Sequence, residues 1–449
     1  MQYTNRRNPV LPVSMHVPDG EAHMMSDGGL YIYGSYDDRE NEYCSGRYFV
    51  VSTSDMEHWK VSGESFGNSD IPWLNDPDAP KYPGGIDWLH PSPFIQKMID
   101  KMVAEMTAQG IDPMQYQPKE GEPLLYAPDC IEKDGKYYLY FCLNDGREGV
   151  AVSDSPEGPF TDPLQLPCGG IDPAIFIDDD GQAYYYWGQV HANGVKLNPD
   201  MVSFDEKEIV SDLLTEEEHH FHEGTSVRKI GDAYYCVFAD VERGRPTALG
   251  YATGKSPLGP FTYRGIIIDN AQCDPASWNN HGSIECFNGQ WYVFYHRSSR
   301  GTEQSRRLCI EPIEILPDGT IPEVKMTSQG AGMPFKPGED IMGYQACELK
   351  GSIYIAPEEN GEESLMNISD GDEAVFRYVE STDPYKEIMI EAQGSGTVEI
   401  FMDEDPAGKI RIKDGVQEDT QIDHRQGKYE LTLKFMQPEK LEVKKIVLG

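Results

Sequence analysis

A short phrase that recurs five times along the chain constrains its fold more than any other feature. Each copy is a turn dipeptide of Gly, Asp or Asn, followed by an alternating run rich in Tyr and β-branched residues. The copies occupy residues 27–37, 134–142, 180–188, 231–240 and 288–297. Such a phrase is typical of a tight β-hairpin. Five hairpins, each the inner part of a small antiparallel sheet, predict a five-bladed β-propeller over residues 1–322.

Two further segments depart from this repeat. Residues 61–123 contain loops rich in Pro and Gly and a helical stretch near residues 93–110. We expect them to form an insertion that packs over one end of the ring. After a linker at 323–344, short alternating strands over 345–449 predict a β-sandwich of jelly-roll type. The chain is therefore expected to be all-β, with two domains.

The charge and cysteine content exclude some classes of protein. The 76 acidic residues outnumber the 38 basic ones, for a formal net charge of −38. Nucleic acids and anionic membranes are recognised through clustered Lys and Arg, so neither is an expected partner. The N-terminus lacks the apolar core of a signal peptide, and the nine cysteines include no CxxC pair. These features predict a cytoplasmic protein.

Three carboxylates stand in register with the repeat. Asp19, Asp172 and Glu223 lie 12, 12 and 11 residues before the first tyrosine of their own hairpins, which are Tyr31, Tyr184 and Tyr234. Equivalent positions of different blades face the same end of a propeller, so we expect the three to share one pocket. Acidic residues are also common in turns, and that is the alternative for each one taken alone.

Such a set of acids suits the hydrolysis of an acetal. One carboxylic acid must be protonated to donate to the leaving oxygen, and another must be ionised to activate water or attack carbon. A third anion nearby disfavours ionisation of the acid and raises its pKa. The sequence therefore suggests a glycosidase.

The motifs around these acids resemble glycoside hydrolase family 43. They are PDGEAH (18–23), YAPD (126–129), IDPAIFIDDDG (171–181), HEGTSVRKIGD (222–232) and NNHGSIE (279–285), and the likeness covers about residues 8–322. The resemblance implies an inverting hydrolase with Asp19 as general base, Asp172 as pKa modulator and Glu223 as general acid. It also implies exo-acting release of α-L-arabinofuranose or β-D-xylose from hemicellulose-derived oligosaccharides.

Five other residues are candidates for the pocket. Asp129 precedes the second hairpin and is expected to support the site or bind a substrate hydroxyl, unless it only caps a turn. His281 shares the register of the acids, and the resemblance implies a structural calcium ion near it, with waters completing its shell. Arg306 resembles the family arginine that reaches the substrate. Trp73 is a candidate to stack on a sugar, with a place in the core as the alternative. Phe221 is a candidate to shield Glu223 from water. No organic cofactor is expected.

Alternatives remain open for both domains. A retaining fructosyl hydrolase or transferase also uses a five-bladed propeller and three carboxylates, and a non-catalytic carbohydrate-binding propeller would need none. The C-terminal sandwich resembles carbohydrate-binding modules of the family 6 type. However, all tryptophans precede it, at positions 59, 73, 88, 187, 278 and 291. We expect a structural or pocket-capping domain, with sugar binding through Tyr or Phe as the alternative.

Overall fold

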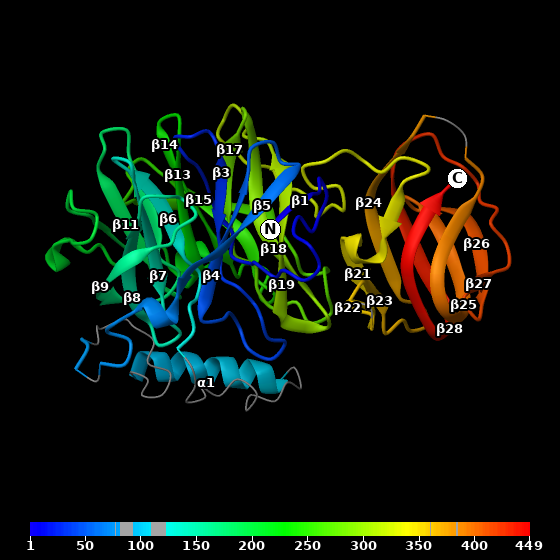
Figure 1. Ribbon diagram of the computed structural model, residues 1–449, viewed down its shortest axis with the longest axis horizontal. Helices are drawn as coiled ribbons and strands as arrows, with labels where there is room; N and C mark the ends of the chain where they lie inside the picture. Colours follow the sequence, from blue (N-terminus) through cyan, green and yellow to red (C-terminus); the bar gives the residue numbers. More distant parts are fainter. Residues whose placement is uncertain (77, 81–92, 109–122, 360, 383–384) are drawn as a thin grey trace.

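The regular structure of the protein is almost entirely β. The computed structural model describes residues 1–449 except 77, 81–92, 109–122, 360 and 383–384. Five small antiparallel sheets form a ring, and a sixth, larger sheet forms the C-terminal domain beside it (Figure 1). The predicted fold class, a five-bladed propeller followed by a β-rich C-terminal domain, is confirmed.

Each of the five sheets is one blade, built from consecutive strands. Blade 1 contains β1 (Gln2–Thr4), β2 (Glu21–Met24), β3 (Leu30–Tyr33), β4 (Arg47–Thr53) and β5 (His58–Gly67). Blade 2 contains β6 (Asp129–Lys133), β7 (Lys136–Cys142), β8 (Arg147–Ser153) and β9 (Thr161–Gly169). Blade 3 contains β10 (Ala174–Ile177), β11 (Ala183–Trp187) and β12 (Asn193–Lys196). Blade 4 contains β13 (Phe221–Ile230), β14 (Ala233–Asp240), β15 (Ala248–Gly254) and β16 (Phe261–Ile268). Blade 5 contains β17 (Ser283–Phe287), β18 (Gln290–Ser299) and β19 (Thr302–Ile313).

The first strands of the hairpins form the inner wall of the ring. β2, β6, β10, β13 and β17 contact one another in that order, and β17 returns to β2. A parallel bridge between Gly20 and Gly282 joins blades 1 and 5 at the point of closure. The inner ends of all five blades therefore surround one axis.

The tyrosine-rich phrases form the cores between blades. Successive residues of a strand point to opposite faces, so one run supplies two neighbouring interfaces. In β11, Tyr184 and Tyr186 pack toward blade 4, whereas Tyr185 and Trp187 pack toward blade 2. Each of the five interfaces between adjacent blades has a buried cluster of this kind. This is why the phrase is apolar at nearly every position instead of at every second one.

The C-terminal domain is one sheet that encloses its own core. It contains β20 (Asp340–Met342), β21 (Glu348–Lys350), β22 (Tyr354–Pro357), β23 (Glu363–Met366), β24 (Glu373–Ser381), β25 (Ile388–Met402), β26 (Asp405–Lys413), β27 (Val416–Gln417) and β28 (Gly427–Leu448). The long strands β25 and β28 pair with several register shifts, which bend the sheet around the buried cluster. β20 lies within the range expected as linker and pairs with β28.

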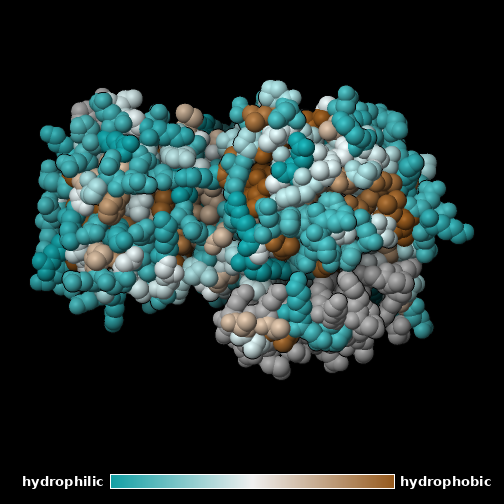
Figure 2. Space-filling view, turned by 180° about the vertical axis from the view of Figure 1, so that it is seen from behind, coloured by the Kyte–Doolittle hydropathy of each residue, from teal (hydrophilic) through white to brown (hydrophobic). Residues whose placement is uncertain are grey.

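Helices are few among the described residues. They are α1 (Pro93–Ala108), α2 (Glu216–His219), η1 (Asn68–Asp70), η3 (Glu206–Glu208) and η4 (Gly343–Gln345). α1, from the expected insertion, lies across one edge of the propeller (Figure 1). Among the described residues, no helix has the length and apolar character needed to span a membrane. The face shown in Figure 2 is largely hydrophilic, with apolar residues in scattered groups.

Candidate active site

The predicted acids meet at one end of the propeller axis. Asp19, Asp172 and His281 each lie two residues before an inner strand, namely β2, β10 and β17, and Glu223 lies near the start of β13. Because the inner strands run side by side around the axis, these equivalent positions come together from blades 1, 3, 4 and 5. The register seen in the sequence therefore corresponds to a shared location.

His281 lies at the centre of this group. Its Nδ1 is 3.8 Å from Oδ1 of Asp19 and 3.7 Å from Oδ2 of Asp172. Its ring packs against Gly224, next to Glu223: a Cβ placed on Gly224 would lie 2.6 Å from Nε2. Burial lowers the pKa of His281, so the ring is neutral at neutral pH. One neutral imidazole thus links all three acids.

Asp19 is held as an ionised carboxylate. Its Oδ1 accepts a hydrogen bond from Nη1 of Arg306 at 3.0 Å, and Ser35 donates to Oδ2. His296 adds a contact at 3.3 Å between its Nδ1 and Oδ1. Burial alone would raise the pKa of Asp19, but the charge of Arg306 and the contact with His296 outweigh it and hold that pKa well below its usual range. Asp19 is therefore ionised at neutral pH.

Glu223 is the most exposed of the three acids. Its side chain is 12% exposed, against 5% for Asp19 and 7% for Asp172. Gln189 donates to Oε2 of Glu223 at 2.6 Å, and Nε2 of His222 lies 3.7 Å from the same oxygen. These neighbours, with Arg245, lower the pKa of Glu223 against the effect of burial.

Asp172 holds the proton that Glu223 lacks. Burial and the charges of Glu223 and Asp19 raise its pKa well above the ordinary value. Because the two carboxylates interact, their pKa values move apart: that of Asp172 rises and that of Glu223 falls. The sequence led us to expect the raised pKa on Glu223; in the unliganded structure it lies on Asp172, because His222 and Arg245 stabilise the Glu223 carboxylate.

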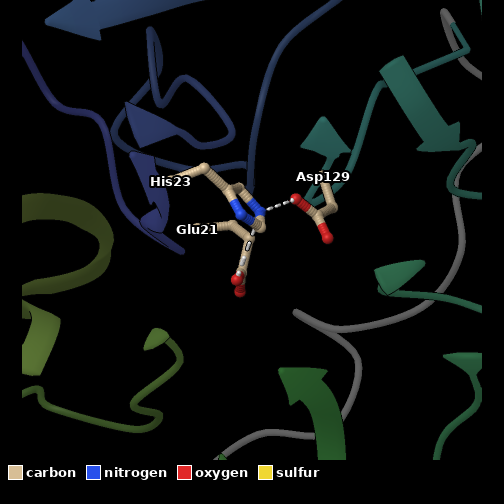
Figure 3. A group of neighbouring side chains, drawn as sticks. All are labelled: Glu21, His23 and Asp129. Atoms are coloured by element: carbon tan, nitrogen blue, oxygen red, sulfur yellow. Dashed lines mark hydrogen bonds and ion pairs between the residues drawn. The ribbon is translucent and has the colours of Figure 1, made fainter. Parts of the chain in front are cut away.

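A second polar layer fills the axis below the acids. Figure 3 shows Glu21 and His23 from β2 facing Asp129 from β6, with His23 Nε2 2.7 Å from Asp129 Oδ1. Arg228 of β13 donates to Glu21 Oε1 at 2.7 Å and to the carbonyl of Ala22. Burial raises the pKa of both Glu21 and Asp129 to about 7. Asp129 thus supports the channel from within instead of lining the pocket.

Two residues predicted to line the pocket, Phe221 and Trp73, instead pack against other side chains of the protein. Phe221 is fully buried and packs edge-on against Phe238, so it cannot contact a substrate or shield Glu223 from the pocket side. The ring of Trp73 stacks on Phe141, lies near Arg147, and donates its N–H to Pro163. Among the described residues, these contacts account for Trp73 without any sugar.

Several polar neighbours of the acids were not singled out from the sequence. Asp37, Ser35 and His296 surround Asp19 or its partner Arg306, and Gln189 and Arg245 act on Glu223. Ser35 and Asp37 follow β3 at the end of the first tyrosine-rich phrase, and His296 lies within β18 near the end of the fifth. The common signal is therefore a polar residue at or just beyond the end of a tyrosine-rich phrase.

The surroundings of His281 offer few ligands for calcium. This ion takes six to eight oxygen ligands. Nδ1 of His281 faces Asp19 and Asp172, and Asp19 is already engaged by Arg306 and Ser35. Within the described ranges, the buried group with His and acid ligand atoms close together is instead Glu21, His23 and Asp129, where Arg228 supplies a fixed positive charge. Calcium at His281 would rest on Nε2 and waters alone, and stays a prediction.

Comparison with known proteins identifies the family. The family model described as glycosyl hydrolases family 43 matches residues 103–321. A xylosidase/arabinosidase of Thermoclostridium stercorarium is 31% identical over 389 residues, which cover 77% of this chain and 72% of the relative. The chain belongs to glycoside hydrolase family 43. It is therefore a glycoside hydrolase, as the resemblance of its motifs implied.

Solved structures share the fold of this family 43 hydrolase, one over most of the chain and another over nearly all of it. A β-xylosidase/α-arabinofuranosidase from a compost microbial metagenome, in a calcium-free complex with xylotriose, matches with a TM-score of 0.55 and 27% identity. That match covers 72% of this chain and 99% of the other. An arabinoxylan arabinofuranohydrolase from Bacillus subtilis shares the fold over 98% of this chain and 97% of its own, with a TM-score of 0.53 and 22% identity.

Proposed function

We propose that this hydrolase releases terminal α-L-arabinofuranose or β-D-xylose from hemicellulose-derived oligosaccharides, with inversion at the anomeric carbon. The observation that carries the proposal is the gathering of Asp19, Asp172 and Glu223 around His281. The names of the relatives, which include xylosidases and arabinofuranohydrolases, support the choice of sugars.

Asp19 and Glu223 take the two central roles in this proposal. Asp19 is ionised and, as general base, removes a proton from the attacking water. Glu223, as general acid, donates a proton to the leaving oxygen. Acid and base come from blades 4 and 1, with His281 of blade 5 between them, and this arrangement supports attack and departure on opposite sides of a sugar.

Asp172 serves as the proton reservoir of the pair. Glu223 keeps some contact with solvent in the free protein. A sugar bound over it would remove that contact, and loss of hydration favours the neutral carboxylic acid. The shared proton then moves from Asp172 to Glu223 on substrate binding. This accounts for an acid whose pKa is low in the free protein yet which donates a proton in the complex.

Location and metal content complete the proposal. We place the protein in the cytoplasm, acting on imported oligosaccharides; all nine cysteines are free thiols, which supports a reducing compartment. We also propose that the calcium ion predicted near His281 has a structural role. Chelation with EGTA should then lower the thermal midpoint of unfolding, and an unchanged midpoint would contradict a bound calcium.

The experiment is a panel of 4-nitrophenyl glycosides with NMR detection of the first-formed anomer. We expect hydrolysis of the α-L-arabinofuranoside, the β-D-xyloside or both, with inversion. Asp19→Asn and Glu223→Gln should each lower kcat by about 10²- to 10⁴-fold. Retention, with cleavage of fructosides, would favour the fructosyl hydrolase, and unchanged rates in Glu223→Gln would show that Glu223 is not the general acid.

A further inference from the structure

Asp37 is a buried carboxylate whose oxygens accept four hydrogen bonds. Arg306 donates three of them: Nε at 2.9 Å and its backbone N–H at 3.1 Å to Oδ2, and Nη2 at 2.9 Å to Oδ1. The backbone N–H of Cys44 supplies the fourth, at 3.0 Å to Oδ1. Asp37 is almost inaccessible to solvent and lies in the loop after β3. Both of its oxygens are therefore used entirely within the protein.

The pairing with Asp37 fixes the plane of the Arg306 guanidinium. Two parallel N–H···O bonds hold an arginine in one orientation, which a single bond does not. Tyr43 lies over the guanidinium, 4.8 Å from ring centroid to Cζ, and Cys44 Sγ is 3.6 Å from Nη2. In this orientation Nη1 is the group that reaches Asp19, at 3.0 Å from Oδ1.

We propose that Asp37 is a positioning residue, which holds Arg306 so that it gives Asp19 a single hydrogen bond. The inference rests on the proposed role of Asp19 as general base. Asp37 binds the bidentate edge of Arg306 and so holds Nη1 beside Oδ1 of Asp19. Without Asp37 the guanidinium is free to turn away from Asp19, and the carboxylate loses the hydrogen bond and the nearby positive charge that keep it ionised.

The charges around Asp19 determine which way the pKa of Asp19 should move when Asp37 is replaced. The titratable and charged groups that interact with it are Arg306, Asp37, Cys44, Tyr48, Asp172, His281 and His296. If Asp37 acted only as a nearby negative charge, its removal would make Asp19 a stronger acid. If Asp37 holds Arg306 in place, its removal weakens the contact between Arg306 and Asp19, and Asp19 becomes a weaker acid. The two roles therefore move the acid limb of the pH profile in opposite directions.

The experiment compares Asp37→Asn with the unmodified protein in pH profiles of kcat/KM on the better aryl pentoside. We expect kcat to fall about 10- to 100-fold with KM changed less than about threefold, and the acid limb to move to higher pH. Glu311→Gln is the matched control, because Glu311 is a buried carboxylate on the same strand as Arg306 and pairs with Arg297. The acid limb of the Glu311→Gln profile should stay at the pH found for the unmodified protein.

A second variant covers the case in which Asp37→Asn does not fold. Arg306→Lys keeps the charge but cannot bind Asp37 and Asp19 in the same fork, so it should show the same upward shift of the limb. If the acid limb moves to lower pH or stays in place, and kcat is normal, Asp37 does not have this role. In that case Asp19→Asn still abolishes turnover, because the proposed role of Asp19 as general base is unaffected. If the unmodified protein cleaves no pentoside at all, the proposed function fails instead.

Discussion

Asp19 and Asp172 share an uncommon backbone conformation, with φ of 58° and 55°. Non-glycine residues seldom adopt this left-handed region, and such residues concentrate at functional sites. Both occur at the same place in the repeat, just before an inner strand, so the two blades use one turn to aim two carboxylates at the axis. Gly224, with φ of 73°, serves blade 4 in a related way by making room for His281.

A methyl group on Gly224 should damage the site without unfolding the protein. In Gly224→Ala the Cβ would lie 2.6 Å from His281 Nε2, so the imidazole must move away from Asp19 and Asp172. We expect kcat to fall by about tenfold or more, since small misplacements at a reacting centre are costly. Aryl pentoside kinetics and thermal unfolding measure the two effects.

Gly231→Ala provides the control for backbone strain. Gly231 also has a positive φ, of 60°, but no atom lies within 4 Å of the added Cβ. It should lose stability to a similar degree and retain its kcat. Equal kinetic losses in both variants would show that His281 is not the affected group.

For single residues, the sequence predicted the positions of the site residues better than it predicted their pKa values. The register of the hairpins was enough to place Asp19, Asp172, Glu223 and His281 together. Asp37 was missed because its partner Arg306 is 269 residues away and no local pattern links them. The low pKa of Glu223 depends on neighbours in other loops, which spacing along the chain does not reveal.

Among the secondary-structure elements, β19 and β23 are joined across the two domains by a buried ion pair. On β19, Arg306 points to the acids and Arg307 to the C-terminal domain, as alternation along a strand requires. Glu363 of β23, with no exposed side-chain surface, pairs with Arg307 and, at 3.3 Å, with Arg300. Cys347 and Val375 of the C-terminal domain also belong to the core between blades 4 and 5.

Glu363→Gln should therefore destabilise the whole protein. The change leaves two arginines without their buried counter-charge, and breaking a buried pair costs about 3–5 kcal/mol. We expect a loss of about 3 kcal/mol in urea unfolding, because Gln keeps the shape of Glu.

The matched control is Glu40→Gln. Glu40 pairs with the same Arg300, at 3.2 Å, but its side chain is 65% exposed. Its loss should change the free energy of unfolding by less than about 1 kcal/mol. If both variants unfold like the unmodified protein, the C-terminal domain is not held to the ring by this pair.

Elements with a local signature could be predicted, and those defined by distant pairing could not. The turn-and-tyrosine phrases identified five hairpins because each is closed by its own turn. The pairing of β20 with β28 joins positions about a hundred residues apart, so its strand was read as linker. The roles of Phe221 and Trp73 depend on Phe238 and Phe141, which lie on other strands.

In the molecule as a whole, buried acids shape the response to pH. Burial raises the pKa of Glu148 to about 8 and that of Glu311 to about 7, as for the acids on the axis. These groups bind protons in the folded state that the unfolded chain has already released, so stability falls as pH rises toward 8. Asp19 acts oppositely, and its contribution is lost as pH falls below about 4.

We therefore expect a higher thermal midpoint near pH 5.5 than near pH 8. Glu148→Gln should make stability less dependent on pH between pH 6 and 8, because it removes a carboxylate that takes up a proton on folding. The introduced amide can still accept the hydrogen bond from Tyr185. The difference in unfolding free energy should be a few kcal/mol across the range. The exposed Glu314→Gln is the control and should keep the original slope; a slope unchanged in Glu148→Gln would refute the assignment.

The packed axis limits how a substrate can enter and leave the ring. Glu21, His23, Asp129 and Arg228 are buried and pair with one another beneath the acids, so side chains fill the axis there. For the proposed hydrolysis, this means that a sugar chain is not threaded through the ring and must enter and leave on the side of the acids. A filled axis of this kind would suit the proposed release of one unit at a time from a free end.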